Sequence, residues 1–347
     1  MKKRVDGDRP ECTRLLCASQ WAPEGSAIEA MLAQRRQWLQ RNAESGVRTA
    51  LLYVSGWLVQ WHEGSAEAVE AEWLRVRALS AGRAVRVLHR SLGAASLRAG
   101  VQIASLHVAE SAGDVARRLR ALERDSADQE PVALWQALCA PCQVAPAGTA
   151  AMGRRDFVAI ASEDNEAVDL LRLLAEEKGL RIAYQRYAGT DLQRADVGAS
   201  YLDVPLAEST VTRLHALPRR ALLASMTMLG LRDVRQLVLL LGSHEQRART
   251  VLAEAAHWLQ DLARPTAVLV SCPCPKVRAQ ALESLACVPG AQVVAIDAGD
   301  PVRAHAGLVA ELVARREDRD AQDGFFASRN SSEPDPAMHA SSVNPIR

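Results

Sequence analysis

An excess of charge of either sign is missing from this 347-residue chain, which has 42 Lys and Arg against 41 Asp and Glu. Nucleic-acid-binding domains usually concentrate basic charge, so we expect no nucleic-acid partner. Long apolar runs are missing too, since no stretch approaches the roughly 20 apolar residues of a membrane-spanning helix. The basic start MKKR is not followed by an apolar core, so the sequence predicts no secretory signal. Together these absences predict a cytoplasmic protein without a membrane span.

Two CxxC motifs that could together hold a metal ion are also missing. The seven cysteines are an odd number and are scattered along the chain, which in a reducing compartment indicates free thiols. Two close pairs occur, Cys139 with Cys142 and Cys272 with Cys274. A single CxxC followed by a Pro-rich stretch is a weak motif for zinc or redox chemistry. We interpret both pairs as incidental thiols, with a redox or metal role as the alternative.

Apolar spacing divides the first hundred residues into short strands and helices. In order, these are a strand at Thr13–Ser19, a helix at Ser26–Asn42, strands at Ala50–Val54 and Trp57–Trp61, a helix at Ala66–Ser80, and strands at Ala84–Leu88 and Val101–Val108. Ser26 and Glu29 have the spacing of a capping box. Ser55 and Gly56 predict a tight hairpin turn. The order predicts an α+β domain of the ferredoxin-like type.

Strands and helices alternate in the second half of the chain. The strands are 157–162, 180–187, 201–207, 211–216, 235–241, 266–271 and 292–297, and the helices are 166–178, 221–229, 246–263, 277–286 and 302–316. Alternation of this kind predicts parallel strands with helices on both faces, a three-layer α/β domain that is P-loop-GTPase-like or flavodoxin-like. The two strands at 201–207 and 211–216 predict a hairpin.

Composition suggests five segments along the chain. Residues 1–12 are polar and predicted to be flexible, and 13–108 form the first domain. Residues 109–153 contain two short helices followed by a Pro- and Gly-containing linker. Residues 154–316 form the α/β domain. The polar composition of 317–347 predicts a disordered tail.

The stretch Ala50–Gly64, ALLYVSGWLVQWHEG, resembles part of the BLUF domain, the flavin-binding blue-light sensor of bacteria. It matches the family's apolar strand, its turn, and its second strand ending in Gln, two residues and Glu-Gly. The resemblance spans about 13–108 and places the family's flavin-bonded Gln at Gln60 and its flavin-bonded Asn at Asn42. Cys17 and Ser19, on the first strand, would lie beside the flavin. The resemblance implies FAD as the cofactor.

One departure from the family affects the chemistry. The family's light reaction needs a Tyr on the first strand, two residues before Ser19, where this chain has Cys17. A thiol is shorter than a phenol and forms only weak hydrogen bonds, so it cannot replace the phenol in the network of Tyr, Gln60 and flavin. We therefore expect no normal light reaction. The sequence leaves open whether flavin is bound.

Residues 156–316 resemble a bacterial small Ras-like GTPase domain in the order of their elements, with Tyr201–Pro218 similar to its second and third strands. Its nucleotide motifs are missing. Ala161–Asp169 reads ASEDNEAVD, without the glycines, Lys and Ser/Thr that hold phosphates and Mg²⁺. Ser271–Cys274 has the sequence SCPC at the position where the family has its guanine-binding Asn-Lys-x-Asp motif. We expect neither GTP binding nor hydrolysis. A receiver-like or other flavodoxin-like module is the alternative for this half.

The leading hypothesis is a bacterial regulatory adaptor with a degenerate BLUF-like sensor and a pseudo-GTPase-like domain, acting through contacts with a protein partner. A functional FAD-binding light or redox sensor is the first alternative. An enzyme of the α/β half, using the thiols of Cys272 or Cys274, is the second. We predict no catalytic or metal-binding residues, because His62 and His215 have no nucleophile or metal partner at a meaningful spacing. A homo-oligomer is left open.

Overall fold

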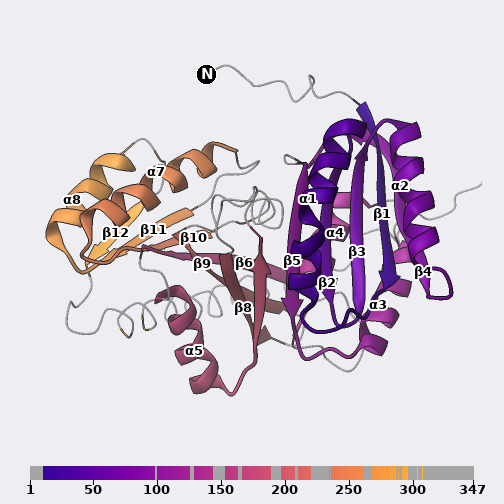
Figure 1. Ribbon diagram of the computed structural model, residues 1–347. Helices are drawn as coiled ribbons and strands as arrows, with labels where there is room; N and C mark the ends of the chain where they lie inside the picture. Colours follow the sequence, from indigo (N-terminus) through magenta and orange to yellow (C-terminus); the bar gives the residue numbers. More distant parts are fainter. Residues whose placement is uncertain are drawn as a thin grey trace, which may run out of the picture. The chain divides into compact units, whose positions relative to one another are not determined.

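The structure is a computed structural model (Figure 1). It describes residues 11–97, 100–125, 129–143, 153–162, 166–188, 197–207, 210–219, 234, 236–261, 267–286, 288, 291–295, 303 and 307. The chain divides into two units, Met1–Ala306 and Gly307–Arg347, and all elements below belong to the first. No helix in the described part is long and apolar enough to cross a membrane.

The N-terminal elements follow the predicted order. The strands are β1 (Glu11–Gln20), β2 (Arg48–Val54), β3 (Trp57–Gly64), β4 (Val85–Ala94) and β5 (Val101–His107), and the helices are α1 (Ala27–Ser45) and α2 (Ala66–Leu79). The strands lie in the order β5-β2-β3-β1-β4, and all neighbours are antiparallel except β2 and β5. Strands β2-β3-β1-β4 with the two crossover helices have the ferredoxin-like topology, so this prediction is confirmed.

The turn between β2 and β3 has the predicted tight form. Ser55 and Gly56 have φ values of 40° and 83°, and a two-residue hairpin with both φ values positive is a type I′ turn. The capping box prediction for α1 is wrong. Ser26 is the residue before the helix, but its side chain makes no capping hydrogen bond.

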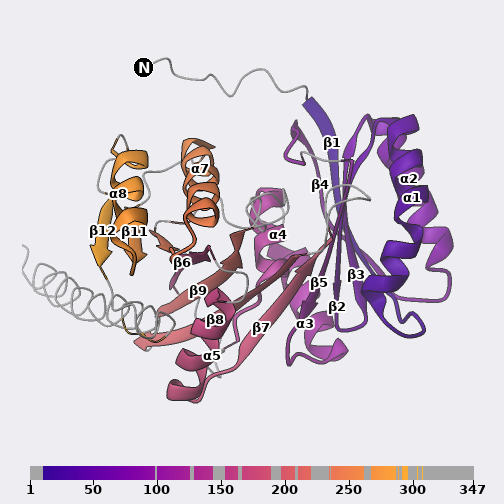
Figure 2. The same ribbon diagram turned by 60° about the vertical axis from the view of Figure 1, so that its left-hand side comes forward.

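Helices cover both faces of the N-terminal sheet (Figure 2). Helices α1 and α2 lie on one face, where Met31 of α1 packs with Leu51 and Leu58 of the sheet. Helices α3 (Ala112–Asp125) and α4 (Pro131–Cys139) lie on the other face. Trp57 and Trp61 are four residues apart on β3 and both belong to the buried core of this second face, as alternation along a strand requires.

The second half is an α/β structure. Its described strands are β6 (Gly153–Ala161), β7 (Ile182–Tyr187), β8 (Val197–Ala207), β9 (Thr210–Pro218), β10 (Gln236–Leu240), β11 (Ala267–Cys272) and β12 (Gln292–Ala295), and its described helices are α5 (Glu166–Lys178), α7 (Glu245–Asp261) and α8 (Pro275–Ser284). Strands β9-β6-β10-β11-β12 are parallel, which is the doubly wound order 2-1-3-4-5. The antiparallel strands β8 and β7 extend this sheet beyond β9.

Helices flank both faces of the parallel strands as predicted, with α5 on one side and α7 and α8 on the other (Figures 1 and 2). The predicted helices at 221–229 and 302–316, the terminal segments 1–10 and 317–347, and Glu163–Asn165 lie outside the described residues, except for two isolated positions.

One feature of the architecture was not predicted. Strand β5 pairs antiparallel with β7, from Ala104 opposite Tyr187 to His107 opposite Tyr184, so both halves contribute to one twelve-stranded sheet. This antiparallel pairing therefore carries backbone hydrogen bonds directly from the N-terminal sheet into the α/β half.

Candidate functional site

A cavity of about 200 Å³ opens between α1 and α2 above the N-terminal sheet. Helix α1 lines it with Gln34, Trp38 and Arg41, whose spacing of three or four residues places them on one helix face. Helix α2 contributes mainly Glu72, Arg75, Val76 and Leu79, and the sheet contributes Ser19, Leu58 and Gln60. The cavity therefore contains two of the four predicted flavin-contacting residues, Ser19 and Gln60.

Cys17 shares the sheet face of these two residues. It is directly opposite Gln60 on β3, and Ser19 is opposite Leu58, so all of these side chains are on the face covered by α1 and α2. Cys17 is fully buried, and burial raises the pKa of its thiol to about 12. At neutral pH the group beside Gln60 is thus an un-ionised thiol, which is a weak hydrogen-bond donor and acceptor.

Asn42 has a different environment from the other three. Its Nδ2 donates to Thr49 Oγ1 at 2.9 Å and to the carbonyl oxygen of Gly100 at 2.7 Å, and the side chain is buried. Both amide protons are therefore used to fasten α1 to β2 and to the chain before β5. Asn42 is not among the described residues that line the cavity.

An ion-pair cluster occupies the space between the two helices. Glu72 of α2 is 5% exposed, and its Oε1 lies 3.3 Å from Arg41 Nε of α1. The same oxygen accepts from Arg75 Nη1, one turn further along α2. The sequence does contain a signal for this buried charge, because Glu72 lies on the same helical stripe as the buried Val69 and Val76.

His62 lies under this cluster on the same sheet face as Gln60. Thr49 Oγ1 accepts from Asn42 Nδ2 and lies 3.1 Å from His62 Nδ1, within hydrogen-bond distance. The pKa of His62 is lowered to about 4, mainly by burial, with Glu72 opposing this shift and Arg41 and Arg75 adding to it. His62 is therefore neutral at pH 7, and its buried Nε2 has no hydrogen-bond partner.

Glu63, in the Glu-Gly pair of the BLUF-like motif, has a structural role. Its carboxylate points to the opposite face from His62, where Oε2 accepts from the backbone N–H groups of Ser96 and Leu97 at 2.8 Å each. This carboxylate thus holds the chain that follows β4.

A second polar network joins α4 to the α/β half. The guanidinium of Arg213 on β9 forms a fully buried, two-pronged ion pair with Asp203 on β8, with distances of 2.6 and 2.8 Å. Arg213 also donates to the carbonyl oxygens of Ala140 and Pro141, and Tyr201 Oη donates to Pro141 at 2.9 Å. Ala140–Gln143, part of the predicted linker, is therefore anchored to the sheet.

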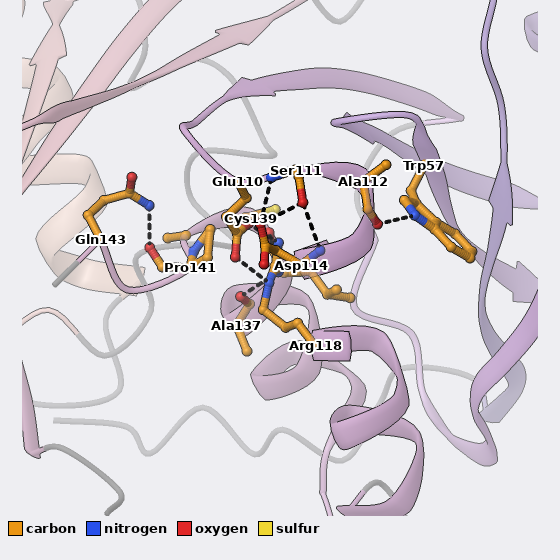
Figure 3. A network of polar contacts seen from close by, with 12 residues as sticks. Trp57, Glu110, Ser111, Ala112, Asp114, Arg118, Ala137, Cys139, Pro141 and Gln143 are labelled. Carbon is orange, nitrogen blue, oxygen red and sulfur yellow. Dashed lines mark hydrogen bonds and ion pairs between the residues drawn. The ribbon is translucent and has the colours of Figure 1, made fainter. Parts of the chain in front are cut away.

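Helices α3 and α4, which precede Ala140–Gln143, are also held by polar contacts (Figure 3). Arg118 of α3 pairs with Glu110 at 2.7 Å and reaches the last carbonyl oxygens of α4. The Trp57 indole donates to Ala112 at the start of α3 at 3.1 Å. Trp61, the residue after Gln60, lies against Trp135 of α4 with the ring centres 5.8 Å apart. Cavity floor, α4 and the Arg213 network thus form one continuous set of contacts.

The carboxyl ends of the parallel strands form the second candidate position, because ligands of doubly wound sheets bind where the strand order reverses. Here that point lies between β6 and β10. Ser162, directly after β6, is fully buried, and its Oγ accepts from the backbone N–H of Gly242 at 2.8 Å. Ala161, the last residue of β6, and Ala167, in the first turn of α5, are buried as well.

The cysteines of both close pairs are free thiols in the described structure. Burial raises the pKa of Cys139 strongly, whereas Cys142 is exposed. Cys272 is buried, its Sγ donates to the carbonyl oxygen of Cys274, and burial raises its pKa. Among the described residues, no group of three or more His, Cys, Asp or Glu side chains could hold a metal ion.

The chain matches no family model and no curated protein. Among solved structures it is similar to the BLUF domain of BlrP1 (21% identity, 37% of this chain and 90% of that chain, TM-score 0.26). BlrB, a BLUF protein in its dark state, is another (22%, 35% and 90%, 0.24), and a third is Klebsiella pneumoniae BlrP1 with FMN and cyclic diGMP (17%, 82% and 76%, 0.27).

A bacterial light-regulated adenylyl cyclase is similar at 16% identity with a TM-score of 0.24. The match covers 33% of this chain and about a third of that protein's length, 34%. Identities and TM-scores this low carry no argument for function. The ferredoxin-like topology of the N-terminal sheet is assigned from its strand order alone.

Proposed function

We propose that this chain is a regulatory signalling protein that acts by changing its contacts with a protein partner, and that its BLUF-like region runs no light-driven flavin reaction. The observation that carries this proposal is the buried, un-ionised thiol of Cys17 directly opposite Gln60. In the BLUF family a phenol at this position connects the Gln to the flavin. A thiol is too short and too weak in hydrogen bonding for that role.

The environment of Asn42 supports the same proposal. Its amide protons bind Thr49 and Gly100, so they would have to leave the buried hydroxyl of Thr49 and the carbonyl oxygen of Gly100 to reach a flavin. Of the groups that a BLUF flavin would meet, the Tyr is replaced by Cys17, the amide of Asn42 is hydrogen-bonded elsewhere, and Gln60 is opposite the Cys17 thiol.

For the α/β half we propose a scaffold without nucleotide chemistry. The hairpin of β8 and β9 beside β6 agrees with the order implied by the GTPase resemblance. At the edge where phosphates would bind, the amide of Gly242 already donates to Ser162. We infer that the surface of this α/β half, which lacks nucleotide-binding groups, serves to recognise another protein. The pairing of β5 with β7 and the anchored Ala140–Gln143 provide a mechanical path between the halves.

A redox or photoactive flavin sensor is the second candidate, favoured by one observation. Ser19 and Gln60 both line the cavity between α1 and α2. An amide group facing a cavity could donate to and accept from the edge of a bound ring.

The visible spectrum before and after blue light separates these functions. The proposed adaptor gives a light-minus-dark difference spectrum without a red shift, whether the isolated protein is colourless or yellow. A yellow protein with no light response but a reversible reduction of its flavin supports the redox sensor. A reversible red shift in the wild-type protein contradicts our proposal.

A further inference from the structure

The buried carboxylate of Glu72 is the most unusual feature of the cavity. It projects from the stripe of α2 that also buries Val69 and Val76, and its side chain is 7% exposed. A buried charge is tolerated when it is paired, and Glu72 is paired on two sides. One partner, Arg75, is on its own helix, and the other, Arg41, is on the opposite wall of the cavity.

The contact between Glu72 and Arg41 spans the gap between the two helices. Gln34, Trp38 and Arg41 form the α1 wall, and Glu72 stands in the α2 wall facing them. At 3.3 Å the two charged groups are in direct contact. The wall residues Glu72 and Arg41 therefore meet in the same cavity that Gln60 faces from the sheet.

We propose that Glu72 is the residue that sets ligand selectivity in this cavity: held by Arg41 and Arg75, it keeps flavin out. The inference rests on the proposed function, because it explains how a BLUF-like scaffold could stand empty of its cofactor. It goes further by assigning the loss to a residue outside the resemblance motifs.

Two physical terms support this assignment. First, the cavity measures about 200 Å³, below the roughly 300–1,000 Å³ of pockets that enclose a drug-sized ligand. Second, an apolar ring entering the cavity would have to separate Glu72 from Arg41 or remove water from both. Separating these two groups is unfavourable, because the carboxylate of Glu72 is almost fully buried and would keep only Arg75 as its partner. Glu72 and Arg41 therefore disfavour a bound ring in two ways, because they occupy space in the cavity and because their ion pair would have to be disrupted.

Riboflavin is the suitable probe, because it carries the ring system without phosphates that Arg41 or Arg75 could bind. Binding is measured by quenching of riboflavin fluorescence on titration with protein. We expect no saturable binding by the wild-type chain and at least about tenfold tighter binding by Glu72→Ala, a difference of about 1.4 kcal/mol. Glu72→Gln keeps the volume of the side chain and removes its charge. A gain by both variants assigns the block to charge, and a gain by Glu72→Ala alone assigns it to volume.

Glu70→Gln is the matched control. Glu70 is two residues away on the same helix, half exposed, and pairs with Arg90 instead of a cavity residue. It should bind riboflavin no better than the wild type. Circular dichroism and thermal unfolding verify that each variant is folded, and Arg41→Gln opens the same contact from the other helix should Glu72→Ala fail to fold.

The inference is overturned if wild type binds riboflavin as tightly as Glu72→Ala, or if no folded variant gains binding. These outcomes are distinct from failure of the proposed function, which requires a red shift in light. A wild-type protein that holds flavin but shows no photoresponse would overturn the role of Glu72 and leave the adaptor proposal intact.

Discussion

The two candidate ligand positions of this chain differ in what occupies them. Between α1 and α2 a cavity of about 200 Å³ remains, lined by Gln60 and crossed by the Arg41–Glu72 ion pair. At the carboxyl edge of the parallel strands, the backbone N–H of Gly242 donates to Ser162, which is fully buried. At the first position a cavity is present, and charged side chains line it. At the second position a backbone N–H group is already hydrogen-bonded to a side chain of the same edge.

This difference teaches that the two positions should respond differently to mutation. Removing one charged group at the first position leaves a space that a ligand could use. Removing Ser162 at the second leaves an unsatisfied amide but supplies none of the Lys, Gly or Ser/Thr groups that phosphate binding needs. Recovery of ligand binding by single substitutions is therefore expected only between α1 and α2.

The largest effect should come from the buried connection between the halves. Asp203→Asn leaves the Arg213 guanidinium without its carboxylate at a fully buried position, so we expect a loss of about 3–5 kcal/mol in the free energy of unfolding. Urea denaturation measures this loss. The control is Asp169→Asn, which breaks the exposed pair with Arg172 and should cost at most about 1 kcal/mol. Equal losses for the two variants would show that Arg213 does not anchor Ala140–Gln143.

The second prediction concerns pH and the floor under the ion-pair cluster. Folding lowers the pKa of His62 from its ordinary 6.5 to about 4, so between these values the unfolded chain binds a proton that the folded chain does not. The stabilisation is complete above pH 6.5 and is lost as the pH falls toward 4, by about 3 kcal/mol.

Urea denaturation at several pH values checks this, with His62→Gln as the matched variant. The other titrating groups are common to both proteins, so the difference between the two profiles isolates His62. Parallel profiles from pH 7 to pH 4 would mean that His62 is not held neutral by its burial.

A smaller effect is expected at the carboxyl edge. Ser162→Ala leaves the Gly242 N–H buried without its acceptor, which should cost about 1–3 kcal/mol of unfolding free energy. Thermal or urea unfolding measures it, and Ser243→Ala, at an exposed neighbouring position, is the control with a change near zero. A loss no larger than that of Ser243→Ala would remove Ser162 from the account of this edge.

The smallest expected effect is that of GTP. A ligand at about 100 times its Kd would add about 2.7 kcal/mol to the stability of the folded state. For GTP with Mg²⁺ we expect no change in the thermal unfolding temperature of either wild type or Ser162→Ala. A magnesium-dependent stabilisation of the wild type would contradict our interpretation of Ala161–Asp169.

Local patterns predicted much of the fold. The tight hairpin turn at Ser55-Gly56 followed from residue type and is confirmed, with positive φ at both residues. The capping box at Ser26 was wrong, because the spacing of a motif does not determine where a side chain points.

Contacts between distant residues could not be predicted in this way. Ala140 and Pro141 read as linker because their partner, Arg213, lies more than seventy residues further along the chain. The edge pairing of β5 with β7 has no local pattern at all. Asn42 and Gln60 were found through a resemblance, but their hydrogen bonds depend on packing, and their role toward flavin stays a prediction. Glu72 could have been found as a carboxylate on an apolar helical stripe.

The central claim is that the scaffold lacks light chemistry because a buried thiol stands where a phenol is required. Its most direct test compares the light-minus-dark spectrum of Glu72→Ala with that of the Glu72→Ala, Cys17→Tyr double variant, both after incubation with FAD. We predict a flat difference spectrum with Cys17 present and a reversible red shift only in the Cys17→Tyr protein. A reversible red shift in the protein that retains Cys17 would contradict the account.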